Sequence, residues 1–269
     1  MKTKNLVGLF FALLFVGLFF SLPTSLAVSQ VFLTRGQMPA ASSTFSTSST
    51  SPSQNSLVLL SISNTAATLD VNPSVSGTAM SWVRIFGKED VDNNGGIILF
   101  RAMNTTSTPS TGPITVTFSG SQSRAAWTLS EFTNVDTSGT NGSGAIVQSS
   151  TATSSCPICV SFVASTTLNA FGSSNNAAYG TFYLENQGIG DGAIAPGDGF
   201  TEITDQDLAS PASGIRMQDE WRSTATTTVD ATFTDIVGVQ ATIGAIEIKD
   251  ATVVVAAVTR KRVITIFND

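Results

Sequence analysis

The stretch AAWTLSEF, residues 125–132, alternates between two kinds of side chain. Ala125, Trp127 and Leu129 share one parity with Glu131, while the other parity mixes hydroxyl and apolar side chains. Because successive side chains of a β-strand point to opposite faces, this pattern predicts a strand whose large apolar face ends in a carboxylate.

The stretch ATIGAIEI, residues 241–248, repeats that pattern. A shorter echo precedes each copy, since Phe100-Arg101 and Thr117-Phe118-Ser119 resemble Trp221-Arg222 and Thr232-Phe233-Thr234. Two interpretations remain open: an internal duplication, or the ordinary recurrence of patterns within a β-sandwich.

The rest of the chain from Ser56 onward reads as short apolar or alternating runs bounded by Gly, Asn, Ser and Pro. Runs of this kind predict many short strands, and no sustained helical period follows the N-terminal segment. We therefore expect an all-β fold, either a sandwich or a barrel.

The N-terminus predicts secretion. Lys2 and Lys4 precede an apolar run from Leu6 to Leu22, and Ser25-Leu26-Ala27 fits a small-residue cleavage site. The alternative is an uncleaved anchor, because the run reaches the roughly 17 residues that a spanning helix needs. We expect a signal peptide over residues 1–27 and no stable membrane span after its cleavage.

The mature chain is expected to have two parts. Residues 28–55 form an apolar segment followed by a Ser/Thr-rich stretch, SSTFSTSSTSPSQN, that is either a linker or an edge strand. Residues 56–269 are predicted to be a single β-sandwich domain.

Composition excludes several function classes. Loss of Lys2 and Lys4 leaves 11 basic residues against 19 acidic ones, a formal charge of −8, which repels nucleic acid and anionic lipid. The chain has no histidine, which removes Ser-His-Asp and Cys-His catalysis and nearly all histidine-based metal sites. The 2 cysteines, Cys156 and Cys159, are too few for a zinc site, and in an exported chain they predict a disulfide-closed turn.

The stretch KEDVDNNGG, residues 88–96, contains the predicted metal ligands Asp90, Asp92 and Asn94, spaced as in the first half of a calcium loop. Arg101 stands where such a loop needs an acid at its twelfth position, so a helix-loop-helix site is excluded. A β-loop calcium site remains, completed by Glu89 or a distant carboxylate. The alternative is a hairpin tip, since Asn and Gly readily adopt positive φ.

Other acidic residues suggest further sites. Glu131 and Glu247 could be the two acids of a retaining glycosidase if their strands crossed one concave face, at a separation of roughly 5 to 5.5 Å. Otherwise each acid ends its strand and pairs with an arginine such as Arg101, Arg124 or Arg222. The Gly-rich, acidic segment 188–207 is expected to be a long loop on the rim of the sandwich.

Several segments resemble the jelly-roll, concanavalin A-like β-sandwich modules of secreted and phage or viral surface proteins. They are NSLVLLSIS, GGIILFRAMN, ITVTFS, AAWTLSEFTNVD, GDGFTEI, MQDEW and ATIGAIEI, and the resemblance covers residues 45–250. It implies an antiparallel jelly-roll sandwich with an extracellular structural or recognition role, and it implies no substrate.

The resulting expectation is a secreted, non-catalytic surface, structural or adhesive protein that binds an extracellular glycan or a partner protein through its loop edges. Calcium is the expected cofactor if the Asp90 loop binds an ion. The alternatives are a glycoside hydrolase using Glu131 and Glu247, and a filament subunit that exchanges a terminal strand, from residues 28–33 or from the β-rich C-terminus.

Overall fold

The computed structural model describes residues 26–156, 161–186, 194–208, 214–234 and 239–251. These residues form 16 strands in antiparallel sheets. The described part of the chain contains no helix, and hence none that is long and apolar enough to cross a membrane. The predicted all-β antiparallel class is confirmed.

The first half of the molecule comprises eight strands. A five-stranded sheet has the order β1-β8-β3-β6-β5, and a three-stranded sheet has the order β2-β7-β4. The strands are β1 (Ser29–Met38), β2 (Ser42–Ser46), β3 (Leu57–Thr65), β4 (Ser74–Gly77), β5 (Val83–Glu89), β6 (Gly95–Ala102), β7 (Ile114–Gln122) and β8 (Arg124–Thr133).

The second half comprises the other eight strands. Its five-stranded sheet has the order β13-β14-β11-β16-β9, and its three-stranded sheet has the order β10-β15-β12. The strands are β9 (Ile146–Cys156), β10 (Ser161–Thr167), β11 (Ala177–Asn186), β12 (Ile194–Pro196), β13 (Thr201–Leu208), β14 (Gly214–Arg222), β15 (Thr228–Thr234) and β16 (Val239–Ile248).

The two halves have the same strand order, because each strand of the second half occupies the place of the strand eight numbers earlier in the first. A local irregularity is repeated as well. The pairing of β5 with β6 shifts register between Arg84 and Phe86, and that of β13 with β14 shifts between Glu202 and Thr204. Order and bulge together favour internal duplication over the chance recurrence of a pattern.

The register confirms one part of the sequence echo and corrects another. Leu57 pairs with Phe132 and Ala177 pairs with Ile248, so AAWTLSEF and ATIGAIEI occupy equivalent positions in β8 and β16. The match of Phe100 with Trp221 is wrong by one residue, because Phe100 faces the three-stranded sheet of its half whereas Trp221 packs against the core between the halves. A shift of one residue in a strand reverses the face on which a side chain lies.

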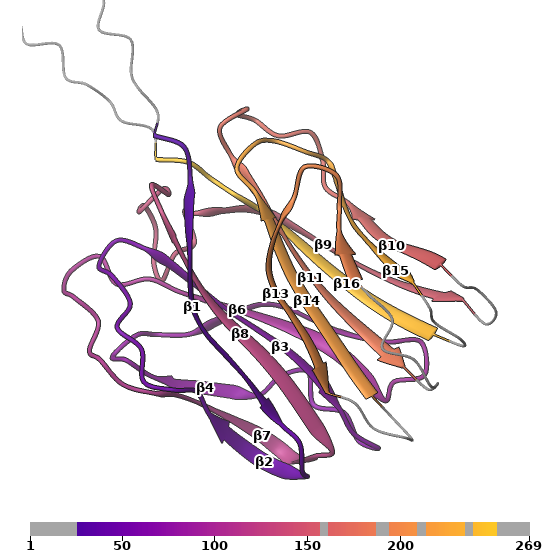
Figure 1. Ribbon diagram of the computed structural model, residues 1–269. Coiled ribbons are helices and arrows are strands. Elements are labelled where there is room, and N and C mark those ends of the chain that lie inside the picture. Colours follow the sequence, from indigo (N-terminus) through magenta and orange to yellow (C-terminus); the bar gives the residue numbers. More distant parts are fainter. Residues whose placement is uncertain (1–25, 157–160, 187–193, 209–213, 235–238, 252–269) are drawn as a thin grey trace, which may run out of the picture.

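Three apolar cores join the four sheets as layers, visible from lower left to right in Figure 1. One core lies between the sheets of the first half and includes Phe45 stacked on Trp127, with ring centroids 4.0 Å apart. The corresponding core of the second half includes Phe182 and Phe233. The central core joins the two five-stranded sheets face to face and includes Leu59 and Tyr183 among its fully buried side chains.

The predicted boundary between residues 55 and 56 does not coincide with a change of sheet. Residues 29–38 and 42–46 form β1 and β2, which lie at the edges of the two sheets of the first half, so only residues 42–46 of the Ser/Thr-rich stretch belong to an edge strand. The sheets change between β8 and β9 instead. The single domain predicted for residues 56–269 stays a prediction, since the halves share a core but no sheet.

The segment 188–207 is not the long loop expected. Residues 194–196 form β12 and residues 201–208 form β13, an edge strand of the second five-stranded sheet; residues 188–193 lie outside the described residues. The many glycines and acids of this segment concealed the alternation that marks β13 as a strand.

Candidate functional site

The Asp90 turn connects β5 to β6 at the point where the two halves meet. Asp90 is 4% exposed, and its Oδ1 accepts a hydrogen bond from the Asn94 backbone N–H at 3.2 Å. Its own N–H donates to the Gly95 carbonyl at 2.8 Å, and Asn93 adopts a φ of 59°. Burial raises the pKa of Asp90, although backbone N–H groups of residues 92–95 oppose the rise. This carboxylate therefore orders the hairpin tip.

The other two predicted calcium ligands behave differently from each other. Asp92 is exposed and accepts a hydrogen bond from the Gln240 side chain of β16. Asn94 stays at the turn, where its Oδ1 and the Asp90 Oδ2 are both buried without a hydrogen-bond partner. Within the described ranges, no three His, Cys, Asp or Glu side chains come together as a metal site. The structure thus brings Asp90 and Asn94 together and directs Asp92 elsewhere.

Glu131 and Glu247 lie on opposite faces of the central layers. Glu131 has the parity of Leu129, which faces the three-stranded sheet of the first half, and its Oε2 accepts a hydrogen bond from the Ser53 N–H at 3.2 Å. Glu247 has the parity of Ala245, which faces the other three-stranded sheet. Both five-stranded sheets therefore separate these carboxylates, and they share no cleft.

Glu247 is fully buried and bound within its own half. Its Oε1 accepts from the Asn176 side chain at 2.5 Å, and its Oε2 accepts from the Gln148 side chain at 2.6 Å. The expected pairing of these acids with arginines is not what holds them, because amides and a backbone N–H donate instead. In both halves the acid at the end of the strand anchors a neighbouring loop or strand.

Two further predictions fall at the margins of the described structure. Cys156 is the last residue of β9, but its expected disulfide partner Cys159 lies outside the described residues. The N-terminal segment offered for strand exchange, residues 28–33, is already used, since Val28 is buried and residues from Ser29 onward pair with β8. The C-terminal candidate, residues 252–269, lies outside the described residues.

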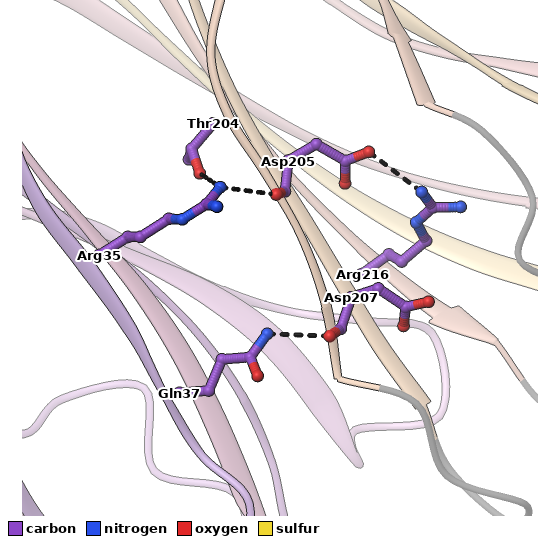
Figure 2. A network of polar contacts seen from close by, with 6 residues as sticks. All are labelled: Arg35, Gln37, Thr204, Asp205, Asp207 and Arg216. Atoms are coloured by element: carbon purple, nitrogen blue, oxygen red, sulfur yellow. Dashed lines mark hydrogen bonds and ion pairs between the residues drawn. The ribbon is translucent and has the colours of Figure 1, made fainter.

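The edge strands β1 and β13 of the two halves are joined by side chains, as Figure 2 shows. The Arg35 Nη1 donates to the Thr204 Oγ1 and to the Asp205 carbonyl, each at 3.0 Å. The Gln37 side chain donates to the Asp207 carbonyl at 2.9 Å. These bonds use polar groups of an edge strand that would otherwise face solvent, and they fasten one sheet edge to the other.

A row of polar side chains on the outer face of β14 was missed by the sequence analysis. Arg216 forms an ion pair with Asp205 at 3.0 Å, while Gln218 and Glu220 are fully buried. Burial and the charge of Asp205 raise the pKa of Glu202, and the neighbouring Gln218 amide opposes that rise without the geometry of a full hydrogen bond. The sequence GIRMQDEW contains a signal for this row, because Arg216, Gln218 and Glu220 alternate along one face of a predicted strand whose other face carries Asp219. Polar side chains on both faces are unusual in a buried strand.

Glu220 has the largest perturbation in that row. Burial raises its pKa to about 8, assisted by the charges of Asp230, Asp219 and Glu202, whereas a hydrogen bond from the Gly197 N–H opposes the rise. This carboxyl group is therefore largely protonated at neutral pH.

Asp219 occupies the other face of β14, within the contact between the two halves. It is fully buried, and burial raises its pKa to about 6. Hydroxyl groups lie close enough to lower that pKa but not in the geometry of full hydrogen bonds; they belong to Thr181, Thr128, Ser61 and Tyr179. A titratable acid thus sits between the two five-stranded sheets.

A hollow of about 270 Å³ opens where two loops of the first half meet the connection between β8 and β9. Asn104, Thr106, Thr140 and Asn141 line it, with Met80 and Met103 among the apolar residues. The Asn104 Oδ1 accepts from the Thr106 N–H and the Ser107 N–H, each at 3.1 Å, so the loop is ordered by its own side chain. Both glycosylation sequons of the chain, at Asn104 and Asn141, contribute to this rim.

The chain matches no protein-family model, no curated protein and no solved structure.

Proposed function

We propose that this chain is a secreted, non-catalytic structural or adhesive surface protein built from two jelly rolls, which binds a glycan or a partner protein through loops at one end. The observation that carries the proposal is the repeated strand order. In each half, the first, eighth, third, sixth and fifth strands form one sheet, and the second, seventh and fourth strands form the other. An eight-stranded jelly roll of two Greek keys has this order except for its fifth strand, which lies beside the fourth in the other sheet.

The hydrogen bonds that the buried acidic side chains accept within the fold support a structural role. Asp90 orders a turn, Glu131 holds the loop at Ser53, and Glu247 binds Asn176 and Gln148. Acids engaged in this way stabilise the fold, and the separation of Glu131 from Glu247 leaves the glycosidase alternative without its pair. A rigid layered scaffold with binding loops at its ends is a common arrangement for recognition.

The loop-end hollow of the first half is the part of the described surface that best fits a ligand. Its lining of Asn, Thr, Ser and Gly supplies hydroxyl and amide groups, and Met80 and Met103 supply apolar surface. Hydroxyls and amides both donate and accept, which suits a polyhydroxylated glycan. The second half has a different hollow, lined by Ala170, Phe171, Ser174, Ala225, Thr226 and Thr227.

The test is a glycan-array and cell-surface binding measurement on the chain beginning at Val28. Thr140→Lys should abolish binding, because the lysine fills the hollow, whereas Thr226→Lys in the other hollow is the matched control and should leave binding intact. Equal melting temperatures would show that both variants fold. Loss of binding in the Thr226 variant alone would place recognition in the second half. Turnover of a bound glycan would contradict the non-catalytic assignment.

A further inference from the structure

The two halves meet at a cluster of buried oxygen atoms near the end of β3. Tyr183, from β11 of the second half, places its hydroxyl group over Gly95 at the start of β6, where any larger residue would collide with the ring. Beside this contact lies a small hollow of about 170 Å³, lined by Thr65, Asn94 and Ser123 of the first half and by Glu185 of the second. Residues far apart in sequence therefore line one partly open hollow.

Several oxygen atoms around this space have no hydrogen-bond partner. They are the Asp90 Oδ2, the Asn94 Oδ1, the Thr65 Oγ1 and the Tyr183 hydroxyl. The side chains of Asp90, Thr65 and Tyr183 are at most 5% exposed, so solvent does not readily satisfy them. A buried polar atom without a partner costs free energy, and so many in one place indicate a missing ligand.

Two carboxylates, one from each half, give this cluster a negative charge. Asp90 and Glu185 approach from opposite halves, and the charges of both raise the pKa of the Tyr183 hydroxyl, although burial is the main cause of that rise. Both carboxylates therefore lie near one oxygen atom. Two acids that are desolvated close together are stabilised by a cation between them.

We propose that this cluster binds a hard cation, with Ca²⁺ as the best fit, that joins the two halves of the molecule. Carboxylate, amide and hydroxyl oxygens are the ligands that calcium prefers, and with few charges they form a weak site of the extracellular kind. The ligands are Asp90, Asn94 and Thr65 from the first half and Glu185 from the second. Glu185 thus takes the role that the sequence pattern gave to Asp92, whose side chain instead binds Gln240.

The experiment is a set of thermal melts of the chain from Val28, each in millimolar CaCl₂ and in excess EDTA. Because an ion that binds only the folded state stabilises it by mass action, calcium at about tenfold its dissociation constant should raise the wild-type midpoint by about 3 °C. Asp90→Asn and Glu185→Gln should each abolish the calcium-dependent rise. Asp92→Asn is the matched control from the same turn, and it should retain the full rise.

Calorimetric titration with CaCl₂ keeps the proposal testable if one variant melts poorly. One ion should bind per chain in the wild type and in the Asp92 variant, and binding should weaken at least tenfold in the Glu185 variant. Two results would overturn the proposal: identical wild-type melts in calcium and EDTA, or a calcium effect that depends on Asp92 and not on Glu185. Neither result bears on the loop-end hollow, so this proposal and the proposed function fail separately.

Discussion

The two halves of this molecule have one strand order and two different interiors. Phe100 in β6 pairs with Arg84, and Glu220 in β14 pairs with Glu202, in each case beside the same bulge. These positions are therefore equivalent, yet one carries an aromatic ring in an apolar core and the other a buried carboxyl group. The neighbouring positions, Leu99 and Asp219, differ in the same way.

The difference shows that the topology does not depend on an apolar residue at every inward position. In the first half, the outer face of β6 is apolar, and Ile98 and Phe100 pack in its core. In the second half, Gln218 and Glu220 occupy the equivalent places and require nearby donors such as the Gly197 N–H. We infer that the first half supplies most of the packing stability and that the second half carries the acids with the largest pKa shifts, Asp219 and Glu220.

The largest effect is expected from making the first half resemble the second. Leu99→Asp places a carboxylate in the central core, where its cross-strand partner Ser61 supplies one hydroxyl group, whereas four hydroxyl groups surround Asp219. We expect a loss of more than about 4 kcal/mol in the free energy of unfolding, because an unpaired acid is buried. Urea unfolding measures it, with Leu99→Ala as the control for lost volume. A Leu99→Asp loss no larger than the control would show that the first half also tolerates buried acids.

A pH-dependent effect of intermediate size is expected at Glu220. Its pKa rises from 4.5 in the unfolded chain to about 8 in the folded protein, so the folded state holds a proton that the unfolded state releases. The contribution of this group to stability is complete below pH 4.5 and is lost as the pH rises through 8. Glu220→Gln removes this dependence and should stabilise the protein at pH 9 by on the order of 4 kcal/mol relative to wild type.

Melting curves from pH 4.5 to pH 9 measure this difference between variant and wild type. Asp198→Asn, at an exposed position beside the same region, is the control and should show no such trend. A Glu220→Gln variant that is destabilised equally at every pH would show that the carboxyl group is held by its hydrogen bond and not strained by burial.

The smallest effect is expected at the edge where β1 meets β13. Arg35→Ala removes the hydrogen bonds to Thr204 and to the Asp205 carbonyl, but Arg35 is exposed and water can replace it. We expect a loss of about 1 kcal/mol. Hydrogen exchange of the β13 amides should rise while that of β3 stays constant. Faster exchange in β3 as well would show that this edge holds the two halves together.

Parts of the fold could be predicted from the sequence because they depend on local alternation. The repeated pattern of AAWTLSEF and ATIGAIEI is visible in the sequence, and the structure places the two stretches in β8 and β16 in the same register. The match of Phe100 with Trp221 was wrong because β6 and β14 differ in composition. The residue equivalent to Phe100 is Glu220, and the aromatic residue of β14 lies one position later, on the other face. The sequence did not predict β13, because its residues are mostly polar and it follows a Gly-rich segment. Its strand conformation depends on pairing with β14.

The candidate site shows the same division. The turn of Asp90 and Asn94 could be found from its spacing, because a hairpin tip is a local structure. Nothing in the sequence connects it to Glu185, which lies more than 90 residues away and reaches the turn only because two five-stranded sheets pack face to face. Glu131 and Glu247 occupy equivalent positions in the two halves. Because the halves pack with their five-stranded sheets face to face, equivalent outward side chains point in opposite directions and do not meet.

The sequence by itself determined the all-β class, the strands of strict alternation and the turn at Asp90, because the period of two and the conformations of Asn and Gly act within a few residues. Only the tertiary structure decided which acids meet, which are buried as protonated groups and which merely anchor a loop. Burial and proximity arise from the stacking of whole sheets, and a side chain acquires its pKa and its partners only when another layer covers it.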